Sequence, residues 1–586
     1  MAKTSFSFWE YNFCGSWDEL SSTSKSSESV DGVNMGKIDK VYGTENWGDA
    51  GGIDYGFYQT DSMEEGLLFC EYHQQQKPES YLDYELFDDR RFEIISPTLQ
   101  TSLEEIAKLD EISSGIQVIS ESKKKNQQDF SFASLELLKK YDHGRLNGGR
   151  IVQPSSDAPY TNLAGQELST EEIIRIAGAR FIQSNCQVVD IASMLNNPFG
   201  LSFSNLSDEE AKNVELVELL LASAEKVGQQ QFERARRLLN YCDILSSSSG
   251  NPVQRVVYYF SEALRERIDL GTGRISSGFG KQSSVLNQEM TILNPATLAC
   301  HERIPFFQVA RFTGIQAIID NVAGAKRIHV IDLQIRSGAQ WAVLMQALVS
   351  RHDCLLELLK ISAIGTTSKQ LIEDTGKRLA SFAESMSIPF SFEVVMVPDM
   401  LDLKKELFEL DAEEAIAIYS EYSLMNLIFV PNRLESVMRV LRNINPRIMV
   451  VMEVEANNNS PSFVNRFIEV LFFHGAYFDC IDACMERDDP TRLITELMFH
   501  QGIRNIVAKE GEERRIRHVK IDVWRSFFAR FGIIETELST SSLYQASLVL
   551  KKFDSGSSCT LDTNEKSLLI GWKGTPINSL SAWKFT

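Results

Sequence analysis

The stretch "GAKRIHVIDLQIRSGAQWAVLMQAL", residues 324–348, decides the fold class of this chain. An apolar run ends in an acid, Asp332, then comes a polar turn with one glycine, and an amphipathic run follows. A strand, a turn and a helix in this order form the first unit of a doubly wound α/β sheet, and nucleotide cofactors bind at that turn. The stretch therefore predicts a Rossmann-like α/β domain and raises the question of whether it binds a cofactor.

The residues that follow repeat the same alternation. Strand patterns recur at "LLELLKISAIG", "FSFEVVMV", "EAIAIYSEY" and "PRIMVVMEVEA", with helical patterns at "SKQLIEDTGKRLASFAESM" (capped by Ser368), "PNRLESVMRVLRNI" and "SFVNRFIEVLFFHGAYFDCIDA". This alternation predicts a mostly parallel sheet with helices on both faces. We expect further strands at "IRNIVAKE", "YQASLVLKK" and "SLLIGWKG", with the helix "VWRSFFARF" among them. Late strands of this kind complete a methyltransferase-type sheet with an antiparallel pair.

An α-helical cap is predicted ahead of the sheet. Long helical patterns occupy "STEEIIRIAGARFIQ", where Ser169 or Thr170 can cap, "SDEEAKNVELVELLLASAEKVGQQQFERARRLLNYCDIL" and "NPVQRVVYYFSEALRERID". The second pattern carries an apolar stripe at helical spacing, made of Leu216, Leu219, Leu220, Ser223 and Val227. Its LxxLL match, Leu216 to Leu220, is a short helix face that can enter a partner groove, although core packing is the commoner use of such a stripe.

The N-terminal region has a different composition. Residues 1–95 hold 19 Asp and Glu residues against 7 Lys and Arg residues, with aromatic groups at "FSFWEYNF" and "YLDYELFDDRRFEI". Such a composition predicts disorder and is typical of activation segments and of solubilising tails alike. Lys123, Lys124 and Lys125 form a short basic run that is a weak nuclear-import candidate. We therefore predict a mostly disordered regulatory region at 1–160, a helical cap at 161–304 and an α/β core at 305–586.

Charge and composition exclude several classes of protein. The net charge of −21 argues against broad attraction to DNA phosphates or anionic lipid. No stretch approaches about 18 uninterrupted apolar residues, so we expect no membrane span. Nine scattered cysteines form no disulfide framework. A local basic cluster of Arg514, Arg515 and Arg517, next to His518, is a candidate patch for nucleic acid or a partner, and a solvated turn is its simpler interpretation.

The turn after Asp332 is poorly suited to a cofactor. Ile335 and Arg336 stand where an adenosyl site needs glycine, and the second strand ends in "ISAIG" without an acid for ribose. We therefore expect no cofactor, and we expect Asp332 to cap a helix or pair with an arginine. Glu453 and Glu455 share one face of a strand near the same edge. They could hold a small polar ligand, but pairing with arginine or capping the helix after "NNNSPSF" is favoured.

Other chemistry is not favoured by the sequence. Cys480 and Cys484 lie four residues apart on a predicted helix, but with His474 they do not complete a zinc site, so core cysteines are favoured. None of the histidines stands in a catalytic or metal motif, and His329 is expected to be a satisfied core residue. Neither catalytic nor metal-binding residues are predicted.

The motifs from about residue 210 to the end together resemble the plant GRAS family of transcriptional regulators. "RIHVIDLQIRSGAQW" resembles the family's VHIID motif, with His329, Ile331 and Asp332 in its core, flanked by leucine-rich segments at about 214–245 and 379–430. "NPRIMVVMEVEANNNSPSFVNRFIEVL" resembles the PFYRE region. The SAW signature is matched by Trp524 and Gly532, and by Trp572 and Trp583 with the triplet Ser581, Ala582 and Trp583.

The chain departs from the family pattern at several places. The "FY" pair is Phe472 and Phe473, and the "RE" pair falls on Gln501 and Gly502. The N-terminal region contains "SWDEL" but not the extended DELLA motif, so we expect the gibberellin-receptor handle of the DELLA branch to be missing from a chain whose C-terminal half is DELLA-like.

The resemblance implies a regulator of transcription rather than an enzyme. It would act in the nucleus, in plant development, hormone or symbiosis signalling, on an inactive methyltransferase-type scaffold. The resemblance also implies that the leucine-rich segment at 214–245 binds other transcription factors or a second GRAS protein, and that DNA is reached mainly through these partners. The alternative is a methyltransferase-fold enzyme or small-molecule-binding protein, and the glycine-poor turn at 333–338 discriminates against it.

Overall fold

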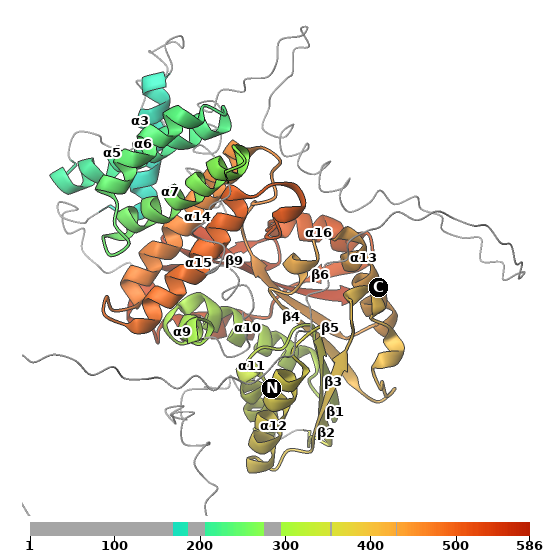
Figure 1. Cartoon of the computed structure of the whole chain (residues 1–586). Helices are drawn as coiled ribbons and strands as arrows, with labels where there is room; N and C mark the ends of the chain where they lie inside the picture. Colours follow the sequence, from blue (N-terminus) through green and yellow to red (C-terminus); the bar gives the residue numbers. More distant parts are fainter. Residues whose placement is uncertain (1–167, 186–205, 275–294, 352–353, 429) are drawn as a thin grey trace, which may run out of the picture. The chain divides into compact units, whose positions relative to one another are not determined.

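The computed structural model describes residues 168–185, 206–274, 295–351, 354–428 and 430–586 (Figure 1). The region at 1–160 that the composition predicts to be disordered lies outside these residues, and so does the basic run at 123–125.

A single large sheet forms the centre of the α/β part. Its strands are β1 (Arg327–Asp332), β2 (Leu358–Gly365), β3 (Phe390–Met396), β4 (Ala415–Glu421), β5 (Ile448–Val454), β6 (Ile533–Thr536), β7 (Cys559–Asn564), β8 (Ser567–Trp572) and β9 (Thr575–Phe585). The order is β3-β2-β1-β4-β5-β9-β8-β7, and β6 pairs with β9. Strands β1 to β5 pair in parallel, whereas β9 runs antiparallel to β5. The predicted doubly wound sheet with an antiparallel completion is confirmed.

Helices cover both faces of the sheet. One face is covered by α10 (Pro305–Asn321), α11 (Ala339–Val349), α12 (Lys369–Ser385) and α17 (Thr540–Leu550), and the other by α13 (Pro431–Ile444) and α16 (Ile521–Ala529). Side chains alternate along each strand, so Ile328 and Val330 of β1 enter the first layer and Ile331 enters the second. Strands β1, β2, β4, β5 and β8 are buried along nearly their whole length, which is why these segments read as continuous apolar runs. Strands β3, β6 and β7 are partly exposed.

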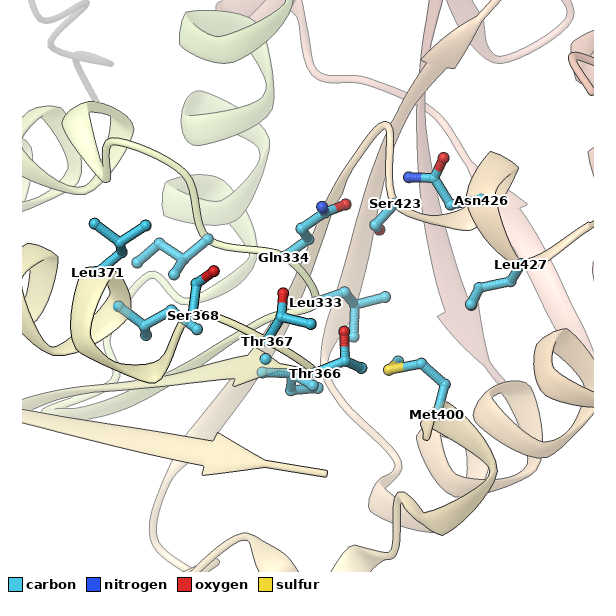
Figure 2. Close-up of a pocket in the computed structure, with 14 residues that line it drawn as sticks. Leu333, Gln334, Thr366, Thr367, Ser368, Leu371, Met400, Ser423, Asn426 and Leu427 are labelled. Atoms are coloured by element: carbon cyan, nitrogen blue, oxygen red, sulfur yellow. The ribbon is translucent and has the colours of Figure 1, made fainter. Parts of the chain in front are cut away.

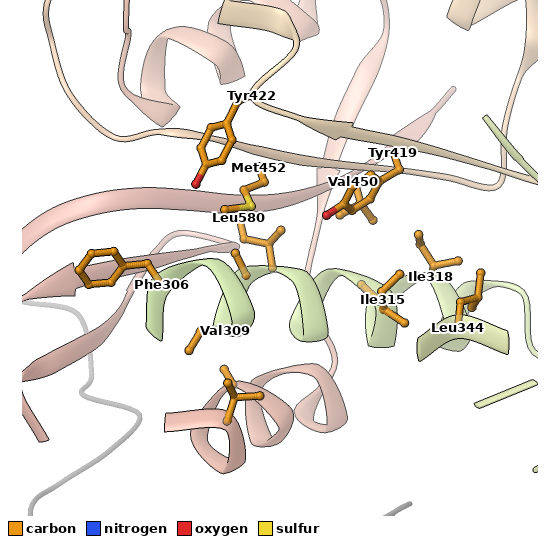
Figure 3. Packing of buried hydrophobic residues seen from close by; sticks show 14 of the residues in the cluster. Phe306, Val309, Ile315, Ile318, Leu344, Tyr419, Tyr422, Val450, Met452 and Leu580 are labelled. Atoms are coloured by element: carbon orange, nitrogen blue, oxygen red, sulfur yellow. The ribbon is translucent and has the colours of Figure 1, made fainter. Parts of the chain in front are cut away.

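Helix α10 is central to the first layer, although the sequence analysis did not identify it. It lies along the sheet, and Figure 3 shows buried side chains of β4, β5 and β9 beside it. Its residues Phe306, Val309, Ile315 and Ile318 belong to the same buried core as those side chains. A Cβ atom at Gly314 would lie 3.1 Å from Cγ1 of Val450, so the glycine lets the helix approach the sheet closely.

The helical cap has its own core, and helices from late in the chain complete it. Its helices are α3 (Thr170–Asn185), α5 (Asp208–Gly228), α6 (Phe232–Leu245) and α7 (Pro252–Gly271), packed against α14 (Phe463–Cys484) and α15 (Pro490–Ala508). Figure 1 shows α14 and α15 between the cap helices and β9. Helix α9 (Pro295–Arg303) packs on α15 and α10. Among the described residues, the cap is thus built from 168–185 and 206–271 together with 463–508.

Side-chain caps fix where several helices begin. Ser207 and Glu210 form a reciprocal capping box at α5, and Asn251 and Gln254 form another at α7. Ser169 caps α3 as predicted, because its Oγ accepts the N–H of Glu172 at 3.3 Å. Ser368 holds the predicted N-cap position of α12, but it has a φ of 57° and makes no side-chain cap hydrogen bond.

Part of the predicted C-terminal tail is wrong. "IRNIVAKE" was expected to be a strand but lies largely in α15, and "YQASLVLKK" was expected to be a strand but lies largely in α17. Short apolar runs do not distinguish a buried helix from a strand, and packing on α9 and α10 decides for helix here. The helix at "VWRSFFARF" and the strand at "SLLIGWKG" are confirmed as α16 and β8.

Short 3-10 helices connect several of these elements: η4 (Met400–Asp402), η5 (Lys405–Leu407), η6 (Leu424–Leu427), η7 (Gly511–Glu513) and η8 (Asp554–Ser558). Across the residues that the structure describes, no helix combines the length and the apolar character that crossing a bilayer requires.

Candidate functional site

The carboxyl edge of the parallel strands is where this class of sheet binds ligands, and β1 delivers Asp332 there. The carboxylate is buried and accepts the N–H of Gln334 at 3.1 Å and the indole N–H of Trp341 at 2.9 Å. Burial raises the pKa of Asp332 to about 7. The expected helix cap or arginine pair is not formed. Asp332 instead closes the turn after β1 and fixes Trp341, a fully buried residue of α11.

The turn at 333–338 is filled by its own side chains. Leu333 and Ile335 are 4% and 2% exposed, so bulky apolar side chains occupy the turn in which an adenosyl site needs glycine. Gly338 has a φ of 75°, and a Cβ atom there would lie 2.9 Å from Cγ2 of Thr375 in α12. The single glycine of the turn therefore serves the packing of α11 on α12.

A small crevice remains at this edge, between the turn after β1, the loop after β2 and η6 (Figure 2). Its volume is about 220 Å³. It is lined by Leu333, Gln334, Ile335, Ile364, Gly365, Thr366, Thr367, Ser368, Leu371, Ile372, Met400, Ser423, Asn426 and Leu427, and none of these side chains is charged. Ligand pockets usually measure about 300–1,000 Å³, so the crevice is small for a cofactor. Gly365 ends β2 where a ribose-binding acid would stand.

A buried ion pair occupies the end of β4. Nε of Arg311 donates to the two carboxylate oxygens of Glu421 at 3.1 and 2.9 Å, and the hydroxyl of Tyr419 donates to Oε2 at 3.0 Å. Burial by itself would raise the pKa of Glu421, but the guanidinium outweighs burial and holds the pKa at about 2. Burial and the same guanidinium lower the pKa of His301, which contacts Nη1 of Arg311, to about 3. Glu421 is thus ionised and engaged.

Glu453 and Glu455 hold the starts of two different helices. Oε1 of Glu453 accepts the N–H groups of Leu424 and Met425 in η6 at 2.9 and 3.4 Å. Oε2 of Glu455 accepts the N–H of Ile521, the first residue of α16, at 3.0 Å. Burial raises the pKa of Glu453 to about 8 and that of Glu455 to about 7. Capping was the favoured interpretation, but the helices are η6 and α16. The predicted target, α14, is capped by Ser462 instead.

Comparison with known proteins identifies the family. Residues 216–584 match the GRAS domain family. The chain belongs to the GRAS domain family.

Related proteins agree with this assignment. The chain is 29% identical over 448 residues to the DELLA protein GAIP of Cucurbita maxima, covering 76% of this chain and 75% of that protein. It is 31% identical over 378 residues to the DELLA protein RGL1 of Arabidopsis thaliana, covering 64% of this chain and 71% of that protein. Among solved structures it is similar to SCL7 of Oryza sativa, with 26% identity and a TM-score of 0.54 over 59% of this chain and 94% of SCL7. The resemblance seen in the motifs is confirmed.

The central residues of the GRAS VHIID motif build the sheet. His329 is fully buried, with Nδ1 2.9 Å from Oε2 of Glu414 and Nε2 2.7 Å from Oγ of Ser362. Burial lowers its pKa to about 4, so the ring is neutral at physiological pH. Ile331 is also fully buried. The expectation that His329 is a satisfied core residue is confirmed.

The GRAS SAW residues join the last strand to the core. Trp524, Trp572 and Trp583 are each at most 2% exposed. The ring of Phe528 stacks on Trp524 at 5.6 Å and meets Trp583 edge-on at 4.7 Å. Ser581 and Ala582 pair with Val451 and Val450 of β5, and Gly532 has the positive φ of 66° required between α16 and β6. These residues are structural.

The predicted partner-binding stripe is not on the surface. Leu216, Leu220 and Val227 are at most 2% exposed, and Leu219 packs against the same cluster of the cap. The stripe is therefore core, which corrects the prediction. The binding alternative fails because α3, α7 and α14 pack against α5.

The same leucine-rich segment exposes a different apolar group. Tyr241, Ile244 and Leu245 at the end of α6 are 59%, 77% and 50% exposed. Tyr241 and Ile244 lie on the side of α6 that faces away from its buried residues Ala235, Leu239 and Cys242, and Leu245 lies beside Tyr241 one turn further on. Sequence reasoning missed this group, although its i, i+3, i+4 spacing was a usable signal.

The predicted basic patch is largely internal. Arg514 is 4% exposed and donates to the carbonyl of Asn458 at 2.7 Å, and burial lowers its pKa to about 9. Arg517 donates to Oδ1 of Asn459 and to the carbonyl of Gly511. Of the three arginines, Arg515 alone is exposed. Arg514 ties its loop to the chain near Asn458, so its burial removes it from the predicted patch for nucleic acid or a partner. Arg517 is partly exposed and Arg515 is exposed, so for these two residues the patch stays a prediction.

The two helical cysteines do not complete a metal site in the described part of the chain. Sγ of Cys480 and Sγ of Cys484 are 3.7 Å apart, and no group of three or more potential metal ligands occurs among the described residues.

Proposed function

We propose that this GRAS-family chain is a nuclear regulator of transcription that binds other transcription factors and performs no catalysis. The observation that carries the proposal is the use of the carboxyl edge: Asp332 holds Trp341, Glu421 holds Arg311, and Glu453 holds η6. These three acids are each engaged in holding the fold. The nuclear location rests on the family resemblance alone.

The outer face of α6 is our candidate for the partner-binding surface. Tyr241, Ile244 and Leu245 give a helical partner segment an apolar stripe to pack on. Arg234 and Arg237 are exposed on the preceding turns, at spacings that continue the same face. These two arginines outweigh Glu233, the exposed acid on the same face, and so favour a partner helix that carries acidic residues. The partner would be another transcription factor or a second GRAS protein, and DNA would be reached mainly through it.

The test is to replace Ile244 and Leu245 together with Asp in the tagged full chain. We expect loss of partners captured from plant nuclear extract, followed by loss of binding to the purified partner, with an unchanged melting temperature because both side chains are exposed. Leu493→Asp is the matched control, since Leu493 is 55% exposed on a different helix. Capture of the same partner by the α6 variant would reject this surface.

The alternative is a small-molecule-binding protein on the methyltransferase fold, and the crevice in Figure 2 is the observation in its favour. We expect no heat of binding for S-adenosylmethionine at about 1 mM, which corresponds to an affinity of roughly 4 kcal/mol. The reason is that Leu333 and Ile335 fill the turn and that Gly365 replaces the ribose acid. Saturable binding that disappears in Asp332→Ala would restore the alternative.

A further inference from the structure

Two thiols lie close together at the C-terminal end of α14. Cys480 and Cys484 are on the same face of the last turn, with their Sγ atoms 3.7 Å apart. Oγ of Ser555, from η8, lies 3.0 Å from Sγ of Cys484. A second sulfur and a hydroxyl therefore surround Cys484, which is an unusual setting for a cysteine that only fills space.

The two thiols differ in access and in acidity. Cys480 is fully buried, and burial raises its pKa well above the ordinary value. Cys484 is partly exposed, and the hydrogen bond from Cys480 lowers its pKa despite burial. The thiolate is the form that reacts with oxidants. Cys484 is thus the thiol that an oxidant can reach from solvent. Cys480 is the buried thiol beside it that can react with the oxidised Cys484.

We propose that Cys484 and Cys480 form a peroxide-sensitive modification site, in which Cys484 is oxidised first and Cys480 then closes a disulfide. The Cys484 thiolate attacks hydrogen peroxide, the O–O bond breaks, and hydroxide leaves a sulfenic acid on Cys484. The sulfur of Cys480 attacks that sulfenic sulfur, the S–O bond breaks, and the departing hydroxide takes the proton of the Cys480 thiol as water. Two thiols are oxidised and one peroxide is reduced.

The disulfide should change the local structure, because regular helix geometry holds the two Cβ atoms too far apart for an S–S bond. Residues i and i+4 of a helix hold their Cβ atoms about 5–6 Å apart, whereas a disulfide needs about 3.5–4.5 Å. The last turn of α14 must therefore distort. That turn carries Asp482, whose Oδ1 accepts Nη1 of Arg255 in α7 at 3.0 Å and Nη2 of Arg492 in α15 at 2.7 Å. Oxidation would loosen the contact of α14 with two helices of the cap.

The experiment treats the reduced full chain with hydrogen peroxide, blocks the remaining thiols with iodoacetamide, and maps tryptic peptides by mass spectrometry. One tryptic peptide, residues 467–487, contains both cysteines. We expect this peptide to lose two hydrogen atoms and to take up no label, several-fold faster than Cys354 is modified. Cys354 is the matched control because it is also partly exposed but lies in a loop. Hydrogen–deuterium exchange should become faster at residues 481–485 in the oxidised protein.

Two variants separate the roles. In Cys480→Ser the peptide should carry sulfenic or higher acids on Cys484, trapped by dimedone while still sulfenic, and no disulfide. In Cys484→Ser the peptide should remain reduced, because the buried Cys480 is not reached. The proposal is overturned if Cys484 reacts no faster than Cys354, if it cross-links to Cys559 instead, or if exchange at 481–485 does not change on oxidation.

Discussion

Removing the charge of Glu421 should destabilise the core strongly. The pKa of this carboxyl falls from its ordinary 4.5 to about 2 because of Arg311. A tenfold change in an equilibrium constant is about 1.4 kcal/mol, so the pair contributes about 3 kcal/mol at neutral pH relative to an acid with an ordinary pKa. Glu421→Gln keeps the shape but leaves the guanidinium of Arg311 buried without a counter-charge, for which a cost of about 3–5 kcal/mol is typical.

The measurement is the free energy of unfolding from urea titrations of wild type and variant at pH 7 and at pH 3. Because the pKa of Glu421 is lowered on folding, its contribution is present above pH 4.5 and is lost as the pH falls toward 2. The difference between wild type and Glu421→Gln should therefore shrink at pH 3. Glu357→Gln is the matched control, since its ion pair with Lys326 is largely exposed and should contribute less than about 1 kcal/mol.

Two results would refute this reasoning. One is a loss of unfolding free energy for Glu421→Gln that is no larger than the loss for Glu357→Gln. This result would mean that the buried ion pair makes no net contribution to stability. The other is a difference that does not depend on pH, which would assign the cost to packing rather than to charge. A double variant with Arg311→Met adds a check, because removing both partners should recover much of the loss.

Two further predictions concern the same edge of the sheet. Burial raises the pKa of Glu453 from 4.5 to about 8, so the folded protein keeps a proton that the unfolded chain loses, and stability falls as the pH rises from 4.5 to about 8. Glu453→Gln should therefore flatten the fall in melting temperature between about pH 5 and 8, and an equally steep fall in the variant would contradict this. Gly338→Ala should cost more stability than Gly511→Ala, because both residues have positive φ but only the Cβ atom at Gly338 would meet another residue, Thr375, at 2.9 Å. Equal unfolding free energies for the two alanine variants would show that backbone strain at positive φ sets the loss of stability, and that the contact with Thr375 adds nothing.

For several site residues the sequence predicted a structural role but not the residue that each one contacts. Asp332 and Glu453 were expected to do structural work, because acids at strand ends near helix starts commonly accept N–H groups. That Asp332 would meet the indole of Trp341 depended on how α11 folds back over the turn. The ion pair of Glu421 with Arg311 was not predicted, since 110 residues separate the two and no local pattern relates them.

The burial of the leucine stripe shows the same limit. Spacing alone placed Leu216 and Leu220 on one face of a helix, and that was correct. Whether the face met solvent, a partner or the protein itself depended on α14, which begins more than 200 residues later in the chain. The sequence also shows the i, i+3, i+4 spacing of Tyr241, Ile244 and Leu245 on α6. Whether these side chains are exposed again depends on which helices pack against α6.

The sequence by itself determined the βαβ alternation, the places where α3, α5 and α7 begin, and the family. These follow from local causes: side-chain period, capping groups and motif residues in a fixed order. Tertiary structure decided which runs of the tail became α15 and α17, why α10 lies against the sheet, and which face of each helix is covered. These depend on contacts between segments distant in the chain, where burial of apolar surface outweighs the small differences in local propensity.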